Sequence, residues 1–174
     1  MHVPGEVERA RRRALFGSAL FLVVAPGVVA GLVPAAITGW EVDERLPGAL
    51  RALGFAIGGV SVAFLLHAFG RFALEGLGTP APVAPTQRLV VGGVYRYVRN
   101  PMYLAVLGAI AGQALAFGSA ELVAYGAILA AAFVAFVRLY EEPTLRAEYG
   151  EQYERYRAAV PGWIPRIKPW EPSR

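Results

Sequence analysis

Four long runs of apolar residues divide this chain and limit what it can fold into. They occupy residues 15–37, 52–69, 102–119 and 122–137, and none of them contains Asp, Glu, Lys or Arg. Each run is close to the roughly 20 residues that an α-helix needs to cross the hydrocarbon of a bilayer. Of the 174 residues, 56% are hydrophobic and only 17% are charged, a balance typical of membrane proteins rather than soluble ones. The sequence therefore predicts an all-α polytopic membrane protein with about four transmembrane helices.

The basic residues predict how these helices are oriented. They gather in the tail before the first run, in the connection between the second and third runs, and after the fourth run. With four spans, these three regions lie on one side of the membrane, which the positive-inside rule makes the cytoplasmic side. We therefore expect an integral membrane protein with both termini in the cytoplasm. Attraction to an anionic leaflet explains the net charge of +4, so no nucleic-acid partner is expected.

The whole chain, residues 1–174, is expected to form one domain. It contains no cysteine, which excludes disulfides, thiolate metal sites and cysteine nucleophiles, and no metal site is expected. Pro26 and Pro34 are expected to kink or divide the first helix. Residues 143–159 are predicted to form a cytoplasmic amphipathic helix that ends before Pro161.

Two polar elements flank the last two apolar runs. A basic and aromatic segment, residues 88–103, precedes the third run, and the adjacent pair Glu141 and Glu142 ends the fourth run about 38 residues beyond Tyr103. Two helices of roughly 20 residues carry the chain across a bilayer and back again. The two polar elements should therefore meet at the same membrane face.

The residue types at these two elements suggest a binding site. Asn100 and Pro101 suit the N-cap and first position of a helix, and one interpretation is only that, with Arg and Tyr anchors at the interface. A helix start beside Arg99 is also suited to binding a carboxylate or phosphate, and two successive carboxylates are suited to an amine or other cation. A ligand with both a carboxylate and an ammonium group, such as an amino-acid moiety, would satisfy both elements.

The third run also carries the pair Gly108 and Gly112, four residues apart. Small residues at this spacing let two helices approach closely. The pair predicts either packing within the bundle, the commoner case, or a possible homodimer.

Three ordered motifs resemble the integral-membrane methyltransferase family, which includes isoprenylcysteine carboxyl methyltransferase and phospholipid N-methyltransferases. They are the segment Gly-Val-Tyr-Arg-Tyr-Val-Arg-Asn-Pro-Met-Tyr at 93–103, Glu-Glu-x-x-Leu at 141–145, and the Tyr-rich stretch with Val-Pro-x-x-x-Pro at 149–165. With Gly-x-Gly at 76–78, the resemblance extends over residues 76–166.

The resemblance implies S-adenosylmethionine as methyl donor, with S-adenosylhomocysteine as product. It implies that one wall of the cofactor pocket is formed by Arg99, Asn100, Pro101 and Tyr103, and that Glu141 and Glu142 hold the cofactor's ammonium or ribose. Gly76 and Gly78 would admit the cofactor at a position without side chains.

The acceptor implied by the resemblance is a membrane lipid or another amphiphile. Asn100 matches the phospholipid-type branch, whereas prenylcysteine enzymes usually carry His there. A phospholipid amine must lose a proton before it attacks, and Glu142 or Tyr103 are the candidate catalytic residues, with His67 as a further one. A prenylcysteine carboxylate needs no base. Two other functions stay open: an NADPH-dependent membrane lipid or sterol reductase, and a non-catalytic membrane scaffold.

Overall fold

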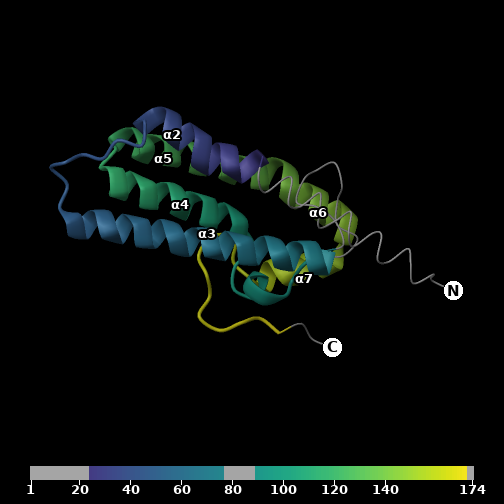
Figure 1. The fold of residues 1–174 in the computed structure, drawn as a ribbon. Helices are drawn as coiled ribbons and strands as arrows, with labels where there is room; N and C mark the ends of the chain where they lie inside the picture. The colour runs from purple at the N-terminus through teal and green to yellow at the C-terminus, as the bar shows by residue number, and fades with distance from the viewer. Residues whose placement is uncertain (1–23, 77–88, 172–174) are drawn as a thin grey trace, which may run out of the picture.

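The computed structural model describes residues 24–76 and 89–171, and within these ranges it contains helices and no strands. Figure 1 shows the long helices side by side as an elongated bundle, with α7 and the C-terminal segment near one end. The elements in chain order are η1 (Val28–Leu32), α2 (Val33–Thr38), α3 (Gly48–Gly76), η2 (Gly93–Arg96), α4 (Pro101–Phe117), α5 (Ala120–Phe136), η3 (Val137–Glu141), α6 (Glu142–Tyr149) and α7 (Glu151–Ala159).

The first helix contains a wide π turn, η1, directly before Pro34. Proline has no N–H, so it leaves a carbonyl one turn earlier without its helical partner. Side chains of the neighbouring helices bind two carbonyls of this turn: Gln113 Nε2 donates to Ala30 O at 2.8 Å, and Tyr125 Oη donates to Val29 O at 2.9 Å. The helix thus continues through the predicted break, because α4 and α5 supply donors that a bilayer does not offer.

Helices α3 and α4 pack with their backbones in close contact. A Cβ atom added to Gly54 would lie 2.6 Å from Gly112 O, and one added to Gly112 would lie 2.5 Å from Gly58 N. Gly108 faces the side chain of Ser61, since a Cβ atom added to Gly108 would lie 2.5 Å from Ser61 Oγ. The glycine pair of the third apolar run is therefore used for packing within the chain, and a homodimer stays a prediction.

We expect Gly54→Ala to destabilise the bundle by about 1–3 kcal/mol, because the new methyl group meets backbone atoms that cannot move aside. Gly59→Ala is the matched control in the same helix, since an added Cβ there meets nothing within 4 Å. The control should be neutral or stabilising by up to about 1 kcal/mol, because alanine is the better helix former. Unfolding of both variants in mixed detergent micelles measures the difference, and equal stabilities would contradict this packing.

The last long helix runs without interruption from Ala120 to Tyr149 and comprises α5, η3 and α6. Pro143 lies within it, directly after the π turn η3. The prediction of one amphipathic helix over residues 143–159 is therefore wrong in its boundaries. The helix breaks at Gly150, whose φ of +50° suits glycine, and α7 follows, ending at Ala159 before Pro161 as expected.

Within residues 24–76 and 89–171, two helices are long and apolar enough to cross a membrane, Gly48–Arg71 and Ala120–Tyr149. Only 22% and 11% of their most apolar windows are buried within the protein, whereas a core helix of a soluble protein is mostly buried. Their apolar surfaces therefore face outward, as bilayer-spanning helices require. The apolar helices Val24–Thr38 and Pro101–Phe117 are shorter, and the four-span topology stays a prediction.

Candidate functional site

Arg99 joins three segments that are distant in the sequence. Its Nη1 donates to Glu142 Oε1 at 2.8 Å and to Tyr153 Oη at 2.9 Å, and its Nε donates to Val160 O at 2.9 Å. The side chains of Arg99 and Glu142 are only 13% and 14% exposed. The predicted meeting of the two polar elements at one end of the bundle is thus confirmed, with α7 as a third participant.

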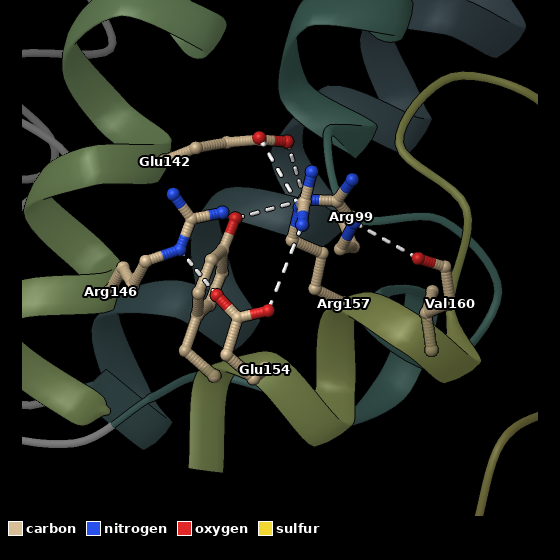
Figure 2. A network of polar contacts seen from close by, with 7 residues as sticks. Arg99, Glu142, Arg146, Glu154, Arg157 and Val160 are labelled. Atoms are coloured by element: carbon tan, nitrogen blue, oxygen red, sulfur yellow. Dashed lines mark hydrogen bonds and ion pairs between the residues drawn. The ribbon is translucent and has the colours of Figure 1, made fainter. Parts of the chain in front are cut away.

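A chain of alternating charges leads from this buried pair to the surface (Figure 2). Glu142 Oε2 lies 3.3 Å from Arg157 Nε, Arg157 Nη1 lies 3.7 Å from Glu154 Oε2, and Glu154 pairs with Arg146. The outer pair is 47% and 45% exposed, where ion pairs contribute about 0–1 kcal/mol. Glu142 therefore has two guanidinium partners, and the inner pair is the energetically important one.

Glu141 has a different environment from its neighbour. Tyr103 Oη donates to Glu141 Oε2 at 2.9 Å, and the Tyr103 ring lies 4.7 Å from the ring of Phe133. Adjacent residues of a helix project about 100° apart, so the two carboxylates leave the helix in different directions. Glu141 faces the start of α4, and Glu142 faces Arg99 and α7.

Asn100 is the N-cap residue of α4, as expected, but its side chain does not cap the helix. The residue is 6% exposed, and its Nδ2 has no hydrogen-bond partner within the described ranges. A buried donor without a partner costs about 1–3 kcal/mol, so each such group needs an explanation. The interpretation of Asn100 as a helix cap is therefore confirmed for its position but does not account for its side chain, whose amide is available to a ligand.

Two cavities meet at these residues. One, of about 190 Å³, is mostly apolar and lies among the first helix, α3, α4 and α5. The other, of about 90 Å³, lies between η3, α6, α7 and the residues before α4. The two cavities share four lining residues: Tyr95, Arg99, Asn100 and Glu141. Pro101 and Tyr103 line the first cavity, and Glu142 lines the second.

The polar role of α7 did not emerge from the sequence. Tyr153 is 1% exposed and lines the second cavity, while Tyr156 Oη donates to Tyr95 O at 2.7 Å. Burial raises the pKa of both phenols, so they stay protonated, and Tyr153 keeps a proton to donate. A sequence pattern that could have indicated this role is the separation of Tyr153 and Tyr156 by three positions, which places both on one face of a helix. Buried hydroxyls on that face need hydrogen-bond partners.

The remaining predicted residues lie elsewhere. Gly76 is the last residue of α3, and Gly78 lies outside the described residues, so the Gly-x-Gly element is not described. His67 is on the exposed side of α3 and lines neither of the two cavities.

A family model described as phospholipid methyltransferase matches residues 49–152. The match extends from the start of α3 into α7 and includes Arg99, Asn100, Tyr103 and the Glu pair. A search of curated proteins and a search of solved structures each found no significant match. Since the family model covers more than half of the chain, this protein belongs to the phospholipid methyltransferase family of integral-membrane methyltransferases.

Proposed function

We propose that the protein transfers a methyl group from S-adenosylmethionine to the amine of a membrane lipid, at a site that faces the cytoplasm. The observation that carries the proposal is the pair of cavities with a common wall. The first cavity extends among the long apolar helices, which suits a lipid, and the second contains Glu142 and Tyr153 in its wall, which suits the polar end of a water-soluble donor.

The polar residues that line the second cavity fit the cofactor by chemistry. When bound, S-adenosylmethionine supplies an electrophilic methyl group on a sulfonium. Asn100 Nδ2, without a partner in the described part of the chain, and the Tyr153 hydroxyl are two donors for its carboxylate, and Glu142 is an acceptor for its ammonium. Ligand pockets usually measure about 300–1,000 Å³, so the side chains around this cavity of about 90 Å³ must move apart on binding.

The apolar cavity favours an amine over a carboxylate as acceptor. Glu141 contributes a carboxylate to its wall, which attracts an ammonium and repels a second carboxylate. Arg99 also lines this cavity, but Glu142 already neutralises its charge. Glu141 is therefore the charge that a lipid headgroup meets there.

An amine acceptor must be deprotonated before it attacks, and Tyr103 with Glu141 suits this role. Tyr103 Oη can accept the ammonium proton while its own proton moves along the 2.9 Å hydrogen bond to Glu141. We assign the proton to this pair rather than to Glu142, because Arg99 and Arg157 already contact the two carboxylate oxygens of Glu142. Both groups are only partly exposed and line the mostly apolar first cavity, which limits the access of water to the reacting atoms.

Thermal unfolding in detergent tests the cofactor assignment. S-adenosylhomocysteine at about 100 times its dissociation constant should stabilise the protein by about 2.7 kcal/mol, which corresponds to a rise in melting temperature of about 5–10 °C for a chain of this length. NADPH should cause no shift. A shift with NADPH alone would instead support the reductase, and no shift with either ligand would support the scaffold.

A further inference from the structure

The C-terminal strap, defined as residues 160–171, is an irregular segment that lies against the residues preceding α4. In Figure 1 it is the yellow segment that follows α7, leaves the bundle and ends near the label C. Four backbone hydrogen bonds attach it: Arg99 N to Pro161 O (2.9 Å), Asn100 N to Gly162 O (3.2 Å), Arg166 N to Tyr97 O (3.0 Å) and Trp170 N to Arg96 O (2.9 Å). The strap is therefore held in a defined position although it has no helix.

Between these attachment points the strap exposes two isoleucines. Ile164 is 79% exposed and Ile167 is 95% exposed. Full burial of such a side chain is worth about 1.5–3 kcal/mol. Two isoleucines this exposed on a segment this firmly attached indicate a surface that binds an apolar partner.

The attachment places the strap beside the start of the apolar helix α4. Its carbonyls bind the amides of Arg99 and Asn100, and the next residue, Pro101, begins the apolar helix α4. The strap therefore lies at the level where the polar segment meets the apolar bundle. Trp163 and Trp170 are aromatic residues of the type that gathers at this level of a bilayer.

The charge of the strap is complementary to an anionic leaflet. Arg166 and the exposed Lys168 alternate with the isoleucines. Arg166 Nη1 donates to the neutral carbonyl Ala159 O at 2.8 Å, which leaves its charge uncompensated among the described residues, whereas Glu171 is paired with Arg96 at 3.3 Å. Basic residues near a membrane surface gain about 1 kcal/mol each from anionic lipids. Apolar and basic side chains in alternation are what an interfacial anchor requires.

We propose that the C-terminal strap binds the anionic leaflet next to the site, with Ile164 and Ile167 among the acyl chains and Arg166 and Lys168 at the headgroups. The strap lies outside the stretch that matches the family model, and the proposal does not depend on methyl transfer. Because the strap's carbonyls hold Arg99 and Asn100, leaflet binding also holds the candidate site in place.

The absence of cysteine makes site-directed spin labelling a direct test. Single variants Ile164→Cys and Ile167→Cys are labelled with a nitroxide and placed in bilayers of phosphatidylcholine with phosphatidylglycerol. Collisions with oxygen, which concentrates in lipid, are compared with those of a water-soluble nickel complex. The references are Ile128→Cys, which is 70% exposed on the apolar helix α5, and Glu148→Cys, exposed on the polar helix α6.

We expect the oxygen-to-nickel accessibility ratio of both strap labels to resemble that of Ile128 and to exceed that of Glu148 several-fold. The ratio should fall when phosphatidylglycerol is omitted or when salt is raised to about 1 M, where the Debye length is only about 3 Å. Strap labels that match the Glu148 label in anionic bilayers would overturn the proposal. Ratios that are equal in neutral and anionic bilayers would overturn its electrostatic part.

Discussion

Replacement of Arg99 by glutamine is expected to lower the free energy of unfolding by about 1.5–3 kcal/mol, the usual contribution of a hydrogen bond to a charged group, and to abolish methyl transfer. The substitution removes the 2.8 Å ion pair to the largely buried Glu142, whose charge is then compensated by Arg157 alone within the described ranges. The substitution also leaves Tyr153 Oη and Val160 O without their shared donor. Three segments would lose their common contact. Unfolding in mixed micelles and a methyl-transfer assay on the same preparation measure both effects.

Arg146→Gln is the matched control for stability. It removes a guanidinium from an ion pair of the same network, but from the exposed pair with Glu154. The expected loss is no more than about 1 kcal/mol. If Arg99→Gln were as stable as the control, Arg99 would not be the residue that joins these segments.

Substitutions of the two adjacent glutamates are expected to affect different steps, the rate for Glu141 and the cofactor affinity for Glu142. Glu141→Gln should lower the rate of methyl transfer by about 10²–10⁴-fold, the usual contribution of an acid–base group, while cofactor affinity changes little. Glu142→Gln should weaken the binding of S-adenosylhomocysteine by about tenfold or more, since a hydrogen bond between charged groups is worth about 1.5–3 kcal/mol. Titration calorimetry gives the affinities, and initial rates at saturating donor give the chemical step.

Each variant serves as the control for the other, because both replace a carboxylate by its isosteric amide at adjacent positions of one helix. A loss of affinity in Glu141→Gln with a normal rate at saturation would reverse the two assignments. Equal losses in both variants would mean that the pair acts as one unit, contrary to the separate contacts of Glu141 with Tyr103 and of Glu142 with Arg99.

The juxtaposition of Arg99 and Tyr103 with the Glu pair could be predicted from the sequence, because two uncharged runs of known length separate them. Helix positions follow from such patterns with little other information, and a start at Pro101 is encoded by the missing N–H of proline. Which of the two glutamates faces which partner could not be predicted. It depends on the π turn before Pro143, which rotates the helix locally.

The contacts made by loop carbonyls also could not be predicted from the sequence. Arg99 binds Val160 O, and Asn100 N binds Gly162 O. Any residue type supplies a carbonyl, so the sequence carries no mark of these bonds. Asn is also a common N-cap residue. The sequence therefore did not indicate that the side chain of Asn100 makes no hydrogen bond to a helix amide.

Methyl transfer to a lipid amine can be tested directly. The most direct measurement incubates the purified protein with methyl-labelled S-adenosylmethionine and a total lipid extract, with Glu141→Gln as the background control, and identifies the labelled product. We predict label on a phospholipid amine that is stable to mild base and falls about 10²-fold or more in the variant. Base-labile label on a carboxyl ester would contradict the amine acceptor, and no labelled lipid at all would contradict the proposed function.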